Sequence, residues 1–329
     1  MRVNLVHPMK NSHVTHTEIK KFADDHVNLK PDDVKEYRAQ AERLREKLEK
    51  HIQDHPEISL KKSLFSGSLA KGTALKDIDD IDLAVYVTEG EAPVAVNELI
   101  PWLAERIRKA FPAFKSHQVV ENSFTITVLY SESGLKVDVV PVFYSGGADW
   151  RGHLISKDTG DKILTSIPLH ISFITARKKA NKSHYRQIVR LMKYWVKQRK
   201  IDDPNFRLKS FMVELLVAHL ADNGMVLDDY PEALANIFAH IAKDGLKTSI
   251  VFSDNYDASL PVLGTSPIHI WDPVNHENNV ASRYDDAQRN AIVSAALDAG
   301  DAIDSALHAH SKGEALRYWR KVFGPAFDA

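Results

Sequence analysis

Two aspartates and a glycine-serine turn are the residues whose types and spacing first suggest chemistry. Asp80 and Asp82 begin a segment that alternates with period two, which predicts a β-strand over 80–87. Side chains two residues apart on a strand share one face, so the two carboxylates project together, about 7 Å apart. Gly67 and Ser68 predict a turn whose exposed N–H groups suit a phosphate chain. Because Mg²⁺ prefers carboxylate and phosphate oxygens, we interpret the two features as half of a metal and phosphate site.

Neither feature is informative alone, because Gly-Ser pairs are common and an Asp-x-Asp pair is often a solvated strand edge. A third acid strengthens the interpretation. The apolar segments 124–130 and 135–142 flank turn-forming residues at 131–134, which predicts a hairpin. Asp138 stands among the apolar residues of the return strand. Such an acid either faces a site or is costly to bury, and beside the first two aspartates it is the natural third metal ligand.

The three motifs together resemble a known superfamily. The Gly-Ser of 67–68, the Asp-Ile-Asp-Leu of 80–83 and the Val-Asp-Val-Val-Pro of 137–141 resemble nucleotidyltransferases of the polymerase-beta type. They are more closely similar to the bacterial cGAS/DncV-like nucleotidyltransferases (CD-NTases), which are kin of cyclic GMP-AMP synthase and of the oligoadenylate synthetases. The family usually has Ser immediately before the first acid of the pair, and this chain departs from that pattern with Asp79.

The resemblance implies an α+β fold, in which a polymerase-beta-like nucleotidyltransferase palm (a mixed sheet with helices) precedes a C-terminal helical lobe. In the family a long N-terminal spine helix bridges the two parts. The periodicity of 31–52 predicts such a helix. Its apolar stripe comprises Val34, Tyr37, Ala41, Leu44, Leu48 and Ile52. We therefore expect a palm domain with the spine helix over 1–165 and a helical domain over 166–329.

The helical lobe carries a second group of candidate residues. The predicted helix 183–200 places four basic residues on one face, namely Arg186, Arg190, Lys193 and Lys197. A solvated basic face is the ordinary explanation of that pattern. However, the segment around Lys193 resembles the family segment whose lysine contacts the donor triphosphate. Ser210 and Phe211 match the family's phosphate-binding serine and base-stacking aromatic residue, although a helical Phe is more often part of a core.

The same resemblance implies a mechanism. Two Mg²⁺ ions, with Mn²⁺ as an alternative, are bound by the catalytic carboxylates Asp80, Asp82 and Asp138. The donor triphosphate is bound by Gly67, Ser68, Lys193 and Ser210, with Phe211 against the base. NTPs, ATP among them, are then joined into a cyclic di- or trinucleotide second messenger with release of pyrophosphate. The implied setting is bacterial anti-phage signalling of the CBASS type.

Composition limits the other classes of protein. The chain has 329 residues, no cysteine and a net charge of −1, which excludes disulfides and thiolate metal sites and argues against bulk nucleic-acid binding. Twelve Lys or Arg residues against two acids between 177 and 209 suit a bound polyphosphate better than a long duplex. Because no apolar run approaches the roughly 18 residues of a membrane span, we expect a soluble cytoplasmic protein without membrane contact.

Partners and alternatives follow from the same motifs. Beyond NTPs, we expect a downstream effector that senses the product, and regulatory protein partners. A linear oligoadenylate synthetase-like enzyme or another nucleotide-transferring enzyme would use the same three acids. A non-catalytic nucleotide- or RNA-binding regulator is the alternative of another class, which the intact acids disfavour. The sequence does not specify the bases, the ring size or linkage, the activating signal or the oligomeric state.

Overall fold

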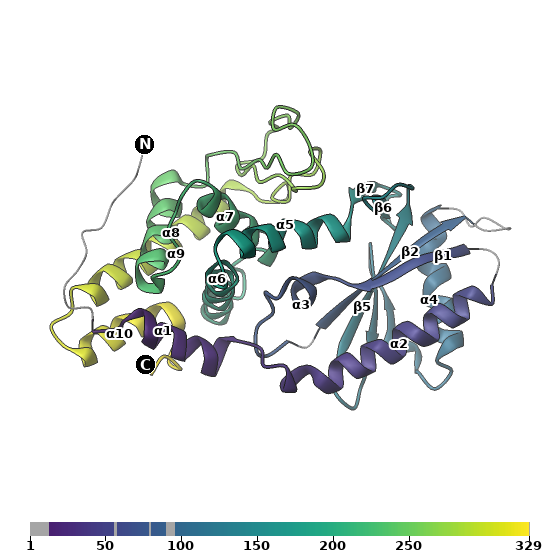
Figure 1. The fold of residues 1–329 in the computed structure, drawn as a ribbon, viewed down its shortest axis with the longest axis horizontal. Coiled ribbons are helices and arrows are strands. Elements are labelled where there is room, and N and C mark those ends of the chain that lie inside the picture. The colour runs from purple at the N-terminus through teal and green to yellow at the C-terminus, as the bar shows by residue number, and fades with distance from the viewer. Residues whose placement is uncertain (1–12, 56–57, 79, 90–95, 329) are drawn as a thin grey trace. The chain divides into compact units, whose positions relative to one another are not determined.

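The computed structural model describes residues 13–55, 58–78, 80–89 and 96–328 (Figure 1). The chain divides into two compact units, which we describe separately. A palm unit comprises 29–174, and a helical unit comprises 1–28 together with 175–329. The domain boundary expected after residue 165 stays a prediction. None of the described helices is long and apolar enough to cross a membrane.

The palm unit is built on a seven-stranded mixed sheet. Its strands are β1 (Ile58–Phe65), β2 (Asp80–Glu89), β3 (Val119–Glu121), β4 (Ile126–Leu129), β5 (Lys136–Tyr144), β6 (Gly152–Ile155) and β7 (Lys162–Thr165). The order is β1-β2-β5-β4-β3, and β6 pairs with both β5 and β7. Strands β2 and β5 are parallel neighbours, whereas the other pairs are antiparallel. The predicted hairpin is confirmed as β4–β5, and the two strands that carry the candidate acids are adjacent.

One face of this sheet is covered by α2 (Lys35–Gln53) and α4 (Leu99–Ala110), which run alongside the strands in Figure 1. The predicted stripe of α2 is confirmed, because Ala41, Leu44, Leu48 and Ile52 are at most 1% exposed. They share a core with Ile81, Leu83, Val85 and Val87 of β2. A register slip of one residue would expose this whole apolar set, so the core fixes which side chains of β2 face the other way.

The opposite face carries the even-numbered residues of β2. Ala84 and Tyr86 form a small buried cluster there with Val142, against which Trp150 and Leu154 pack. Tyr86 also accepts a hydrogen bond through its hydroxyl oxygen from the backbone N–H of Ile167, 3.0 Å away. The cluster covers this end of the face, and the aspartates lie at the opposite end of β2.

The helical unit contains α1 (His16–Phe22), the π-helix η1 (Ala23–Val27), α6 (His184–Asp202), α7 (Ser210–Asp222), α8 (Tyr230–Asp244), α9 (Asp286–Leu307) and α10 (Lys312–Phe323). The N-terminal segment belongs to this unit because Phe22, 1% exposed, lies in its aromatic core. The ring centroid of Phe22 is 5.4 Å from that of Phe323 and 4.7 Å from that of Phe327. Burial of such large apolar rings outweighs the entropy lost when the segment is ordered.

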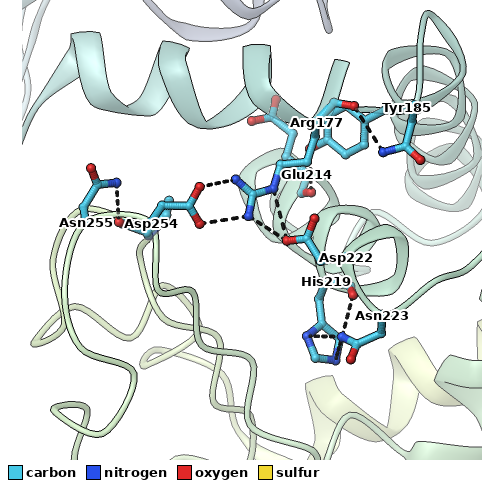
Figure 2. A network of polar contacts seen from close by, with 10 residues as sticks. Arg177, Tyr185, Glu214, His219, Asp222, Asn223, Asp254 and Asn255 are labelled. Atoms are coloured by element: carbon cyan, nitrogen blue, oxygen red, sulfur yellow. Dashed lines mark hydrogen bonds and ion pairs between the residues drawn. The ribbon is translucent and has the colours of Figure 1, made fainter. Parts of the chain in front are cut away.

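A buried arginine joins three segments of the helical unit (Figure 2). Arg177, near the end of α5 (Ile167–Ala180), has a side chain only 8% exposed. It donates to the Oδ2 of Asp222 from Nε at 3.2 Å and from Nη2 at 2.6 Å. It also binds both carboxylate oxygens of Asp254. Burial opposes the guanidinium charge, but the bonds to Asp254 and Asp222 outweigh it and raise the pKa of Arg177.

We expect Arg177→Leu to lower the free energy of unfolding by about 2 kcal/mol, because two carboxylates lose their common partner at a partly buried position. Chemical denaturation of the full chain measures the change. Arg317→Leu is the matched control, since Arg317 is 68% exposed and pairs only loosely with Glu314. Its expected effect is below about 0.5 kcal/mol. Equal losses in the two variants would contradict an anchoring role for Arg177.

Candidate active site

Two of the predicted aspartates lie side by side in the palm unit. The parallel register of β2 and β5 pairs Asp82 with Asp138 and Asp80 with Lys136. The antiparallel register of β4 and β5 pairs Thr127 with the same Asp138. Three neighbouring strands therefore place Asp82, Asp138 and Thr127 in one row across the sheet. The row lies on the face opposite the helices, because the odd-numbered residues of β2 fill the apolar core.

The adjacency of two carboxylates has an electrostatic consequence. Neighbouring strands lie about 4.8 Å apart, and like charges at directly opposed positions destabilise a sheet. A divalent cation removes that repulsion, and the carboxylate oxygens of Asp82 and Asp138 are the donors that Mg²⁺ or Mn²⁺ prefers. Asp80, two residues earlier on β2, is exposed. Among the described residues no three His, Asp or Glu side chains converge closely enough to hold a metal, so the three-carboxylate site stays a prediction.

The glycine of the predicted turn lies close to Asp82, which together with Asp138 we call the acid row. Gly67 has a φ of +61°, in the left-handed region that favours glycine. A Cβ atom placed on it would lie 1.6 Å from Oδ2 of Asp82. The preceding residue ties the turn to the strand, since the backbone N–H of Ser66 donates to the carbonyl oxygen of Asp82 at 2.8 Å. Glycine is therefore required here by backbone conformation and by the close approach to the carboxylate.

Ser68 is the second residue of the short helix α3 (Gly67–Lys71) and is partly exposed. Its carbonyl oxygen accepts from the backbone N–H of Thr73 at 2.9 Å, which closes the turn. The predicted binding of phosphate by Gly67 and Ser68 is not decided by this geometry and stays a prediction. Asp79, the departure from the family pattern, lies outside the described residues.

Two polar residues beside Asp138 were not singled out from the sequence. The hydroxyl of Thr127 donates to Oδ1 of Asp138 at 2.5 Å, and Nδ2 of Asn122 donates to Oγ1 of Thr127 at 2.9 Å. A sequence signal for this contact existed. In the hairpin, Tyr130 and Leu135 flank the turn, and the backbone N–H of Tyr130 donates to the carbonyl of Leu135 at 2.8 Å. Counting back from that pair places Thr127 opposite Asp138.

In the helical unit, the predicted phosphate ligand Lys193 lies on the confirmed helix α6. It is 6% exposed, and its Nζ donates to Oε1 of Glu214 on α7 at 2.6 Å. Glu214, 2% exposed, was not identified from the sequence, although an acid in an apolar helix is a detectable signal. Tyr185 donates its hydroxyl to the backbone carbonyl of Glu214 at 2.9 Å, and Figure 2 shows these two residues together. Burial first, and then the charge of Glu214, raise the pKa of Tyr185.

The other predicted residues of the helical unit occupy the helices expected for them. Ser210 is the first residue of α7 and is exposed, and Phe211 beside it is partly buried. On α6 the remaining basic residues are also partly buried, and burial lowers the pKa of each; these residues are Arg186, Arg190 and Lys197. Partial burial of cations is not typical of the solvated basic face that was the alternative explanation. The joint binding of one nucleotide by both units stays a prediction.

Comparisons with known proteins agree with this arrangement. Residues 14–157 match the family model described as "Second Messenger Oligonucleotide or Dinucleotide Synthetase domain" (SMODS). The chain is 50% identical over 319 residues to the cyclic AMP-AMP-AMP synthase of Escherichia coli strain MS 115-1, covering 97% of this chain and 99% of that protein. It is 31% identical to the CBASS oligonucleotide cyclase CdnC of E. coli strain KTE188, over 95% and 98% of the two chains.

Solved structures of a CdnC protein are similar over nearly their full length. The structure of CdnC from E. coli MS115-1 with ATP has a TM-score of 0.87 and 50% identity, covering 96% of this chain and all of that chain. The structure of the CdnC:HORMA-deltaN complex also has a TM-score of 0.87, with 49% identity and coverage of 96% and 99%. At this identity and coverage, the likeness extends to both units of the chain.

We expect Gly67→Ala to weaken Mn²⁺ binding to the acid row by tenfold or more, because the new methyl group displaces the Asp82 carboxylate. Electron paramagnetic resonance of Mn²⁺ measures the affinity. Gly134→Ala is the matched control: Gly134 also has a positive φ, +74°, but nothing lies within 4 Å of its added Cβ. Both variants should lose about 1 kcal/mol of stability from the left-handed backbone. Similar Mn²⁺ affinities in the two would show that the close approach to Asp82 is unimportant.

Proposed function

This chain belongs to the bacterial cGAS/DncV-like nucleotidyltransferases (CD-NTases), and from that premise we propose that it joins three ATP molecules into cyclic tri-AMP. It is a nucleotidyltransferase, and the wider activity, synthesis of a cyclic oligonucleotide in CBASS anti-phage signalling, is that of the family. The choice of ATP and of a three-membered product rests on the relative named cyclic AMP-AMP-AMP synthase and on its structure with ATP. The pairing of Asp82 with Asp138 beside Gly67 is the structural observation that carries the proposal.

The proposed cofactor is a pair of Mg²⁺ ions, within the divalent-metal chemistry of this family. Asp80, Asp82 and Asp138 would hold the ions, since their carboxylates supply the oxygen donors that such ions prefer. When bound, the ions stabilise the negative charge that develops on the transferred phosphoryl group and on pyrophosphate. Gly67 keeps Asp82 in place by leaving no room for a side chain between turn and strand.

Binding of the donor nucleotide is proposed for the remaining predicted residues. Ser68 and Ser210 would donate hydrogen bonds to the triphosphate, and Phe211 would pack on the base. Lys193 would bind the same triphosphate. Its pairing with Glu214 supports this role, because the carboxylate holds the ammonium group in one position. A donor held in this way loses little entropy when the substrate binds, which would favour binding of a polyphosphate by Lys193.

Protein partners are proposed from the relatives. A CdnC protein that is 49% identical forms a complex with HORMA-deltaN, and we propose that a HORMA-type protein binds this chain as its regulator. A separate effector would bind the cyclic product. We place the enzyme in the cytoplasm, where NTPs and Mg²⁺ are available.

We expect Asp138→Asn to reduce pyrophosphate release from ATP on the order of a thousandfold, because one charged ligand of the transferred phosphoryl site is lost. Mass analysis of the products distinguishes cyclic tri-AMP from other rings and from a linear ladder. Asp161→Asn, at an exposed turn between β6 and β7, is the control and should keep full activity. A linear product, a ring of another size, or an active Asp138→Asn enzyme would each contradict the proposal.

The two roles of Lys193 can be separated with a double variant. Lys193→Gln alone leaves Glu214 buried without its cation and should cost about 3 kcal/mol of stability. Lys193→Gln combined with Glu214→Gln should cost about 1 kcal/mol, since a neutral hydrogen bond replaces the ion pair. Both should raise KM for ATP about tenfold if Lys193 binds phosphate. Lys200→Gln, exposed on the same helix, is the control. An unchanged KM in the double variant would make Lys193 purely structural.

A further inference from the structure

We propose that Thr127 is a positioning residue for the Asp138 carboxylate, and that Asn122 orders the Thr127 hydroxyl. The inference rests on the proposed function, because it assumes that Asp138 is a metal ligand of the transfer reaction. It adds a hydrogen-bond chain of two neutral residues that runs from the β3–β4 turn to the acid row. Neither residue would touch the metal or the nucleotide.

The direction of each hydrogen bond in the chain follows from the donors and acceptors present. An ionised carboxylate only accepts, so the 2.5 Å contact between Oγ1 of Thr127 and Oδ1 of Asp138 uses the hydroxyl proton. The amide Nδ2 of Asn122 donates to the oxygen of the same hydroxyl at 2.9 Å. The amide thus occupies a lone pair of Oγ1 and leaves its proton for the carboxylate. Bonds polarised in one direction along such a chain strengthen one another.

These two hydrogen bonds restrict the terminal side-chain torsion of Asp138. The terminal torsion of an aspartate is broad, so an exposed carboxylate samples many orientations. A bond to Oδ1 restricts the Asp138 carboxylate and directs its other oxygen, Oδ2, away from Thr127. In the register of the sheet, β5 has Thr127 of β4 on one side and Asp82 of β2 on the other. Oδ2 is therefore held on the side where a cation shared with Asp82 would bind.

The backbone does not need this hydroxyl, which makes the role testable. The β4–β5 pair is held by its backbone register from Ile126 to Leu129, and valine has the shape and strand preference of threonine. Removing the hydroxyl should therefore free the orientation of the Asp138 carboxylate without disrupting the sheet. Groups that orient a metal ligand from behind typically change metal affinity or activity by about 10–100-fold.

The experiment compares five variants of the full chain: Thr127→Val, Thr127→Ser, Asn122→Ala, Thr125→Val and Asp138→Asn. Thr125 is the matched control, because its hydroxyl also meets Nδ2 of Asn122, at 3.1 Å, but touches no carboxylate in the described structure. Mn²⁺ affinity is measured by electron paramagnetic resonance with a non-hydrolysable ATP analogue. The Mg²⁺ concentration for half-maximal rate, kcat and KM for ATP are measured by pyrophosphate release.

Thr127→Val should weaken Mn²⁺ binding about tenfold and raise the half-maximal Mg²⁺ concentration about as much, with KM for ATP at saturating Mg²⁺ unchanged. Thr127→Ser, which keeps the hydroxyl, should restore wild-type values, and Thr125→Val should equal wild type. Asn122→Ala should show the same defect as Thr127→Val in a smaller degree, about threefold.

Separate outcomes overturn the inference and the proposed function. Wild-type Mn²⁺ affinity in Thr127→Val, with an inactive Asp138→Asn, removes the positioning role and leaves the proposed function intact. An equal defect in Thr127→Ser and Thr127→Val assigns the effect to packing of the β-branched side chain and also overturns it. An active Asp138→Asn enzyme shows that Asp138 is not a metal ligand. That result overturns both the positioning role of Thr127 and the proposed function.

Discussion

The placement of two aspartates opposite each other on adjacent parallel strands is the constraint that defines the candidate site of the palm unit. Asp82 and Asp138 are register partners, and nothing about strand pairing favours two like charges at that spacing. The sheet tolerates them because its other face is closed by the apolar residues of β2, β5, α2 and α4. The core fixes the strand register that holds the two carboxylates together. Like charges that the fold holds close together are typical of functional sites.

Each carboxylate of the acid row is restrained by a neighbouring residue: Asp82 by the backbone of Gly67, and Asp138 by the hydroxyl of Thr127. Gly67 reaches the Asp82 carboxylate in a conformation that residues with a Cβ rarely adopt. Thr127 reaches the Asp138 carboxylate from the neighbouring strand. Both acids are therefore fixed by their surroundings before any ligand binds. This preorganisation matters for phosphoryl transfer, because catalysis of that reaction is mostly positioning and electrostatic stabilisation.

In the helical unit, two buried cations are each paired with carboxylates. Lys193 is held by Glu214, and Arg177 by Asp222 and Asp254. The pairs join helices to one another and to the segment that carries Asp254, so they specify one arrangement of the unit as much as they stabilise it. The ion pair with Glu214 also holds the Lys193 ammonium group in one position inside the unit.

The elements and the acid motifs could be predicted from the sequence, because period-two and period-3.6 patterns and short motifs are local. The hairpin that carries Asp138, the stripe of α2 and helix α6 all followed from such patterns. Three contacts became apparent only in the folded protein. Phe22 packs with Phe323 and Phe327, Glu214 pairs with Lys193, and Gly67 leaves no space beside Asp82. Each of these joins residues far apart in the chain, and their meeting depends on how whole elements pack, which no local period encodes. The position of Thr127 opposite Asp138 could have been predicted from the hairpin register. Its hydrogen bond to Asp138 could not, because that bond depends on side-chain orientation.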